Sequence, residues 1–180
     1  MGKKYIAFYK PYGFVSQFTG DKPEETLSHF DLPPHVYAVG RLDKDSEGLL
    51  LLTDDGPFKH RLSNPDSKCP KVYLAQVEGL PNKEALKKME KGLLIKNYKT
   101  KPCKVKIISE PNLPPRNPPI RFRKTVPTTW LQITLFEGKN RQVRRMTAAI
   151  GYPTLRLVRQ SIDSYSLGEL NPGEWKEIKL

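Results

Sequence analysis

The sequence predicts an α+β fold, and three observations lead to that prediction. Nine runs of alternating or continuous apolar residues are typical of β-strands, whereas only four segments have helical spacing. A chain so rich in strands, with few helices, favours an α+β architecture. A turn-forming seam at residues 64–69 separates two patterned halves. We therefore expect one domain of two α/β lobes, residues 1–65 and 66–180, around a shared, mostly antiparallel sheet, with a cleft where the lobes meet.

The predicted elements follow one another along the chain with clear stop signals. The third helical segment begins after Pro81, and the fourth ends before Gly151 and Pro153, since glycine and proline terminate helices. The expected strands are residues 4–9, 36–40, 49–53, 71–78, 93–96, 103–109, 129–136, 154–159 and 174–178, and the expected helices are residues 26–30, 58–63, 82–91 and 140–150.

Residues 110–127 interrupt this pattern. They contain six prolines and the basic run Arg121-Phe122-Arg123-Lys124. Proline has no amide hydrogen to donate to a neighbouring strand, so the segment is not a central strand. We expect a long surface loop.

Charge points to a polyanionic partner. Lysine and arginine number 31 and aspartate and glutamate 19, which gives a net charge of +12. Such an excess on a small domain is typical of nucleic-acid binding. No apolar run is long enough to span a membrane, and the N-terminus has no signal-peptide pattern, so we expect a cytoplasmic protein without membrane contact. We also expect a monomer.

Metal binding is not expected. Cys69 and Cys103 lack CxxC spacing, and the three histidines are scattered. Reduced thiols in a cytosolic protein are the simplest interpretation.

The segment GRLDKDSEGLLLLTDDG, residues 40–56, holds five carboxylates in a chain dominated by cations. Acids at Asp43, Asp45 and Glu47, with Gly48 sixth and Asp54 twelfth, resemble a calcium loop. The flanks are strand-like where an EF-hand needs helices, and the twelfth residue is not glutamate. A glycosidase pair is a second alternative, but the low aromatic content and positive charge speak against a sugar cleft.

A family resemblance accounts for the acidic segment better. It resembles the GRLD segment of pseudouridine synthases, and three further family segments occur in order: YKPYG at residues 9–13, KVYLAQVEG at 71–79 and EGKNRQVRRMTAAIGYPTLRLVR at 137–159. The match is with the RsuA/RluB/E/F branch, and PRNPPIRFRKTVPTTWLQI at 115–133 resembles its enzymes for large-subunit ribosomal RNA. The resemblance implies the family's catalytic fold over residues 1–180, an RNA-binding cleft and no cofactor. Members of this branch often carry an N-terminal S4 RNA-binding domain, and the sequence departs from them here, so we expect no S4 domain and expect RNA affinity to come from the basic surface of the catalytic domain.

The resemblance implies a role for three residues. Asp43 is the catalytic carboxylate, acting as nucleophile at C1′ or as base at C2′ of the uridine. Arg144 forms an ion pair with Asp43, although the helix pattern alone also permits a solvated arginine. Tyr73 stacks on the target uracil, although a lone tyrosine in a strand is ordinarily a core residue.

The remaining candidates concern RNA contact. Arg41 is expected to hold the target base out of the RNA, or else to pair with Asp45 or Glu47, and Leu155 to lie under the uracil. Lys10 and Pro11 are expected to support their loop. Further RNA-binding candidates are Lys71, Arg121, Arg123, Arg141 and Arg145. The competing class is a non-catalytic RNA-binding or ribosomal protein, which would share the positive charge.

Overall fold

The computed structural model describes residues 2–180, which divide into two compact units. Unit 1 comprises the residues up to Cys69 together with Arg159–Leu180, and unit 2 comprises Pro70–Val158. The chain re-enters unit 1 along strand β9 (Thr154–Ile162). This division differs from the expected second lobe, residues 66–180, because the C-terminal residues pair with the N-terminal strand of unit 1.

Unit 1 is built on three antiparallel strands. β1 (Tyr5–Lys10) lies between β3 (Glu47–Thr53) and β11 (Trp175–Glu177) and is antiparallel to both. β3 is buried along its whole length, because its leucines pack into the core on both faces. Short strands β2 (Tyr37–Ala38) and β10 (Tyr165–Ser166) pair with β3 and with the end of β9.

Helices in unit 1 are short and are started by capping residues. α1 (Gly56–Ser63) begins where Asp55 accepts a hydrogen bond from the Phe58 amide, with proline in the first turn. The helical pattern expected at residues 26–30 is a single 3-10 turn, η2 (Leu27–His29). Further 3-10 turns, η1 (Pro23–Glu25) and η3 (Pro65–Ser67), begin with proline.

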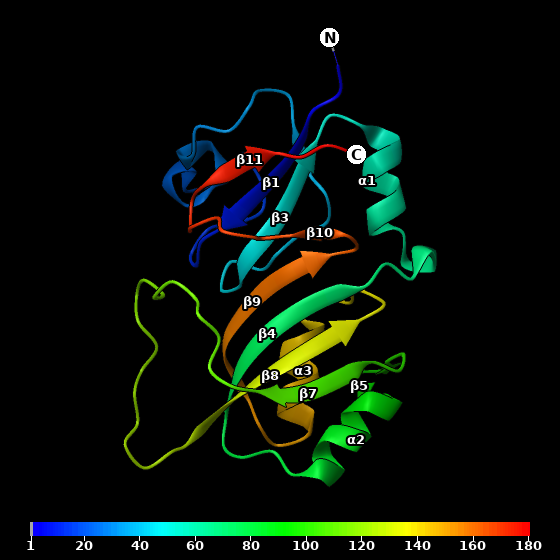
Figure 1. Cartoon of the computed structure of the whole chain (residues 1–180), viewed down its shortest axis with the longest axis vertical. Helices are drawn as coiled ribbons and strands as arrows, with labels where there is room; N and C mark the ends of the chain where they lie inside the picture. Colours follow the sequence, from blue (N-terminus) through cyan, green and yellow to red (C-terminus); the bar gives the residue numbers. More distant parts are fainter. Residues whose placement is uncertain (1) are drawn as a thin grey trace. The chain divides into compact units, whose positions relative to one another are not determined.

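Unit 2 contains three adjacent antiparallel strands and its own apolar core. β8 (Thr128–Leu135) lies between β4 (Lys71–Glu78) and β7 (Lys104–Ile108) and is antiparallel to both. α2 (Lys83–Lys91) and α3 (Gln142–Ala149) contribute Met89, Val143 and Met146 to the apolar cluster formed with these strands. A hairpin of β5 (Leu94–Ile95) and β6 (Tyr98–Lys99) follows α2. Figure 1 shows both helices beside this sheet.

The predicted α+β class and mostly antiparallel pairing are confirmed. All nine expected strands form, with ends displaced by a few residues, and residues 110–127 contain neither helix nor strand. The two-residue strands β6 and β10 are not among the expected strands. Within residues 2–180, no helix is both long and apolar enough to cross a membrane.

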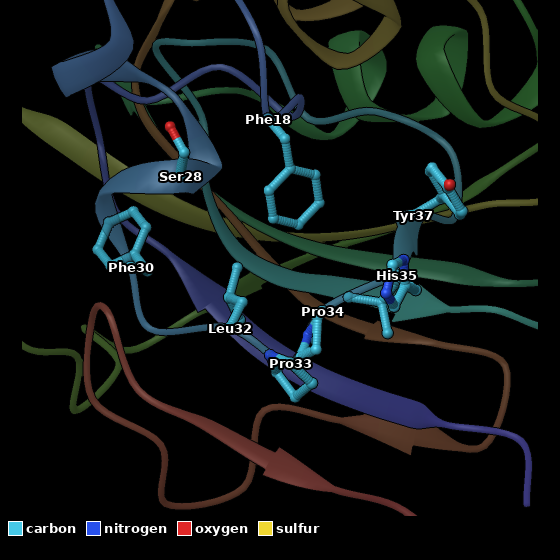
Figure 2. A pocket seen from close by; sticks show the side chains of 9 residues that line it. Phe18, Ser28, Phe30, Leu32, Pro33, Pro34, His35 and Tyr37 are labelled. Carbon is cyan, nitrogen blue, oxygen red and sulfur yellow. The ribbon is translucent and has the colours of Figure 1, made fainter. Parts of the chain in front are cut away.

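A pocket with a mixed polar and apolar lining opens in unit 1 (Figure 2). It has a volume of about 380 Å³ and its lining contains no aspartate, glutamate, lysine or arginine. Figure 2 shows the rings of Phe18, Phe30 and Tyr37 around it. None of the residues predicted from the sequence to act in catalysis lines this pocket.

Candidate active site and RNA-contacting residues

Asp43 lies on the loop between β2 and β3 of unit 1. Its side chain is half-buried, and its carbonyl accepts a hydrogen bond from the Ser46 amide (N···O 3.0 Å). This bond closes a tight turn directly before Glu47, where the buried strand β3 begins. The carboxylate therefore stands at the edge of a rigid core strand, a favourable place for a group that must keep its position.

A second loop of unit 1, residues 11–16, holds the chain on both sides of Asp43; we call it the clamp loop. The buried Ser16 hydroxyl donates to the Leu42 carbonyl (2.7 Å) and accepts from the Leu42 amide (2.9 Å). The Gly13 amide donates to the Lys44 carbonyl (2.8 Å). The main-chain groups of the residues before and after Asp43 are thus held by hydrogen bonds from the clamp loop. The motif YKPYG supplies one of the bonding residues, Gly13.

Lys10 lies beneath the clamp loop and is fully buried. Its Nζ donates to the Pro11 carbonyl (2.9 Å) and the Phe14 carbonyl (2.7 Å). Burial lowers the pKa of Lys10 to about 7, and the nearby carboxylates of Glu47, Asp45 and Asp43 oppose that shift only in part. The supporting role expected for Lys10 is consistent with these contacts.

Gly48 allows β3 to approach β9 closely. It has φ +109°, and a Cβ at this position would lie 2.3 Å from the Arg159 carbonyl oxygen and 2.6 Å from its amide nitrogen. Only glycine fits there without moving the backbone. Arg159 is itself buried, and its Nε donates to the Leu49 carbonyl (2.8 Å). The start of β3, directly after the Asp43 turn, is therefore tightly built.

Arg41 lies on the same loop as Asp43 and is exposed. Its Nη2 donates to Gln17 Oε1 (2.9 Å), and no ion pair with Asp45 or Glu47 is found for it in the described part of the chain. The guanidinium is therefore held at the surface two residues from Asp43, where it is accessible to a ligand.

Tyr73 lies on β4 of unit 2, opposite Ile133 of β8. Only 9% of its surface is exposed, and it belongs to the apolar cluster of that unit with Met146 and Leu157. The structure therefore shows the packing of a core tyrosine, and its stacking role stays a prediction.

Helix α3 carries three of the predicted arginines. Arg141 adopts a left-handed backbone (φ 52°) at the helix start, and its carbonyl accepts from the Arg145 amide (3.0 Å). Arg144 is half-buried, with Nη1 3.5 Å from the Thr154 carbonyl, and Arg145 donates to Asn140 Oδ1 (2.7 Å). The three side chains thus have different surroundings, as the sequence pattern had permitted.

A network around Glu137 secures the start of α3, and sequence reasoning missed it. Glu137 is buried and accepts from Tyr98 Oη, from the Lys101 amide (2.7 Å) and from Gln142 Nε2 (2.8 Å). Burial alone would raise the pKa of Glu137, but these hydrogen bonds outweigh it and lower the pKa below its ordinary value. A glutamate after a strand gives no sequence signal that its partners come from residues 98, 101 and 142.

The loop of residues 111–127, here called the basic loop, is attached to β9 at its base. Arg156 Nη2 donates to the Pro114 carbonyl (2.7 Å), and Arg116 Nη1 donates to the carbonyl of the half-buried Leu155 (3.3 Å). Further along, Arg121 and Arg123 are both exposed, and Arg123 pairs with Glu78 (3.5 Å). Lys71, at the start of β4, is half-buried.

The remaining expectations concern metal binding and the two cysteines. Among residues 2–180, no group of three or more histidine, cysteine, aspartate or glutamate side chains could hold a metal ion. Cys69 and Cys103 are buried thiols, and burial raises the pKa of the Cys103 thiol to about 12.

Comparison with known proteins decides the family. The model of the RNA pseudouridylate synthase family matches residues 4–149, which include Asp43, Tyr73 and Arg144. The chain belongs to this family. The predicted pseudouridine synthase, an isomerase that acts on RNA, is thereby confirmed over the alternative of a non-catalytic RNA-binding or ribosomal protein.

Individual members of the pseudouridine synthase family resemble the chain over almost its full length. Ribosomal large subunit pseudouridine synthase E of Vibrio parahaemolyticus is 53% identical over 178 residues, which are 99% of this chain and 75% of that protein. The enzyme of the same name from Xanthomonas campestris is 55% identical over 174 residues, which are 95% of this chain and 93% of that protein. A crystal structure of a pseudouridylate synthase superposes with a TM-score of 0.81 at 29% identity and covers 99% of this chain and 71% of that one.

Proposed function

We propose that this pseudouridine synthase converts one uridine of large-subunit ribosomal RNA to pseudouridine. The Vibrio and Xanthomonas relatives carry large-subunit names at 53% and 55% identity. The observation that carries the catalytic assignment is the position of Asp43, whose neighbours on both sides are bonded to the clamp loop. Such preorganisation suits a group that acts on a reacting atom.

The proposed reaction breaks the bond between N1 of uracil and C1′ of the ribose and forms a bond between C5 and C1′. Asp43 acts as nucleophile at C1′ or as base at C2′, and the uracil rotates before it reattaches. The proton that leaves C5 goes to solvent and N1 gains one, so atoms balance and no redox partner is required. This chemistry needs a carboxylate beside the ribose and no cofactor.

The family resemblance supplies the further residues of the proposed mechanism. Tyr73 stacks on the flipped uracil, which regains roughly 1 to 3 kcal/mol of the stacking that it lost in the RNA. Arg144 pairs with Asp43 and holds its carboxylate in place beside the ribose. Leu155 packs under the uracil, and the exposed Arg41 of unit 1 holds the base out of the RNA.

RNA affinity is proposed to come from phosphate contacts. The net charge of +12 favours them, and the residues that make them are proposed to be Lys71, Arg121, Arg123, Arg141 and Arg145. Affinity should then fall by about 0.7 to 0.9 log units per contact for each log unit of salt. We propose that the enzyme acts as a monomer in the cytoplasm.

The test is Asp43→Asn, which removes the charge and keeps the size. The rate of pseudouridine formation, followed by tritium release from C5-labelled uridine in a large-subunit transcript under single-turnover conditions, should fall roughly a thousandfold or more. RNA binding should persist, because one negative charge leaves a site that faces phosphates. Asp45→Asn, two residues away, is the matched control and should keep most of the rate.

Two outcomes would overturn parts of the proposal. A near-parental rate for Asp43→Asn would remove the catalytic assignment. Transfer RNA modified at least as fast as the large-subunit transcript in a side-by-side assay would remove the target assignment and leave the catalytic one intact.

A further inference from the structure

Phe122 is the most exposed of the large apolar side chains in the described part of the chain, with 83% of its surface accessible. Single exposed apolar residues are common and need no explanation by themselves. Phe122 differs from the others because of its surroundings, since it lies in the basic loop. Its ring is presented to solvent in the midst of cations.

The neighbours of Phe122 favour a polyanion. Arg121, Arg123 and Lys124 are adjacent in sequence and exposed, and residues 111–127 contain no aspartate or glutamate. Glu78, from β4, pairs with Arg123, and among residues 2–180 no ion pair with a carboxylate is found for Arg121 or Lys124. An exposed ring between cations is the combination that binds unpaired nucleic-acid strands, in which bases stack on the ring and phosphates meet the cations.

The loop presents this ring from an anchored base. Arg156 and Arg116 attach its first half to β9 through the carbonyls of Pro114 and Leu155 (2.7 and 3.3 Å). Its prolines restrict the backbone further. Figure 1 shows the loop extending beyond the strands β7 and β8 that it connects. Anchoring lowers the entropy lost when the loop binds a ligand.

We propose that Phe122 is a stacking platform for an unpaired base of the RNA, other than the uridine that is modified, with Arg121 and Lys124 bound to the flanking phosphates. This inference rests on the proposed function insofar as that function supplies RNA as the ligand. Every base has a π face, so the platform selects unpaired over paired RNA and is tolerant of sequence. The partner is therefore a single-stranded or bulged segment beside the target.

The experiment measures the dissociation constant of a short single-stranded oligouridylate and of a fully paired duplex of the same length. Phe122→Ala should weaken binding of the oligouridylate by about five- to 150-fold, the equivalent of losing one stacked base. Binding of the duplex should be unchanged, since its bases are already stacked. Phe122→Trp should restore the affinity and show indole fluorescence quenched by the oligouridylate.

Salt dependence separates the ring from the charges. Phe122→Ala should leave the slope of log affinity against log salt unchanged, because a ring releases no counterions. Arg121→Ala should lower that slope by about 0.7. Leu94→Ala, another exposed apolar residue of unit 2 at 69% exposure, is the matched control and should change neither affinity nor slope.

Unchanged oligouridylate binding by Phe122→Ala would overturn the proposal, and a protein contact for the ring would then be the better account. Equal losses for oligouridylate and duplex would also overturn it, since that pattern means a loss of general affinity. Both outcomes leave the parental rate of pseudouridine formation in place. Failure of the proposed function would instead appear as a parental protein that binds RNA and forms no pseudouridine.

Discussion

The turn that carries Asp43 and the basic loop are held to different extents. The Asp43 turn is fixed on both sides, over the buried Lys10, because the Ser16 hydroxyl and the Gly13 amide of the clamp loop bond the main chain of Leu42 and Lys44. The basic loop is attached near its base through side chains that reach carbonyls, and its tip is exposed. The contrast suggests that the first region serves geometry and the second serves contact with RNA.

The same contrast predicts different consequences of mutation. Around Asp43 a lost group leaves buried donors and acceptors unpaired, which costs about 1 to 3 kcal/mol each. In the basic loop the side chains are solvated, so substitutions there leave the fold intact. Substitutions around Asp43 should therefore lower the stability and the reaction rate, whereas substitutions in the basic loop should lower the affinity for RNA.

Gly48→Ala should have the largest effect, and it tests the close packing directly after the Asp43 turn. The new Cβ meets the Arg159 backbone at 2.3 Å in a left-handed conformation, so the free energy of unfolding should fall by roughly 4 kcal/mol or more, or the protein should fail to fold. Urea unfolding measures this. Gly56→Ala is the control, because its Cβ would meet nothing within 4 Å; equal stability of the two variants would contradict the packing of β3 against Arg159.

Ser16→Ala should come next. It removes the hydroxyl that bonds both the amide and the carbonyl of Leu42, next to Asp43. The single-turnover rate at saturating RNA should fall by about ten- to 100-fold, on the order of 1 to 3 kcal/mol. RNA affinity should stay the same, and Ser16→Thr should recover part of the rate. Ser63→Ala, an exposed serine on α1, serves as the control. A Ser16→Ala enzyme of parental rate would show that the clamp loop does not position Asp43.

Charge reversal in the basic loop tests whether that loop binds RNA. Arg121→Glu with Arg123→Glu should weaken RNA binding roughly tenfold or more and lower the salt slope, because phosphate contacts are lost. Arg123→Glu also puts a second carboxylate beside Glu78. The rate of the bound complex should not change. Lys83→Glu with Lys87→Glu alters the net charge equally on α2 and tests whether position matters; a collapse of the rate in the loop variant would assign the loop to catalysis.

Lys10→Met should change how the stability of the protein depends on pH. Because the pKa of Lys10 falls from 10.5 to about 7 on folding, the unfolded chain binds more protons between those values. The parental protein should therefore gain stability as pH rises from 7 to 10.5, and this gain should be absent in Lys10→Met. Urea unfolding of both proteins at pH 7 and pH 9 measures the difference. The same change of stability with pH in both proteins would contradict the lowered pKa of Lys10.

The sequence by itself determined the secondary structure and the family. Apolar alternation located all nine expected strands, because side chains alternate between the two faces of a strand wherever it lies in the fold. Four segments in order identified the pseudouridine synthase, and Pro81, Gly151 and Pro153 marked the limits of two helices.

Only the tertiary structure decided which distant segments support these elements. Local pattern does not encode that residues 159–180 return to unit 1, where β11 pairs with β1, since strand pairing is chosen by burial. The Ser16 contact with Leu42 spans 26 residues and the Glu137 contact with Tyr98 spans 39. Such bonds form because folding buries polar groups that must then find partners, and the sequence shows the polar groups without showing which partners burial brings to them.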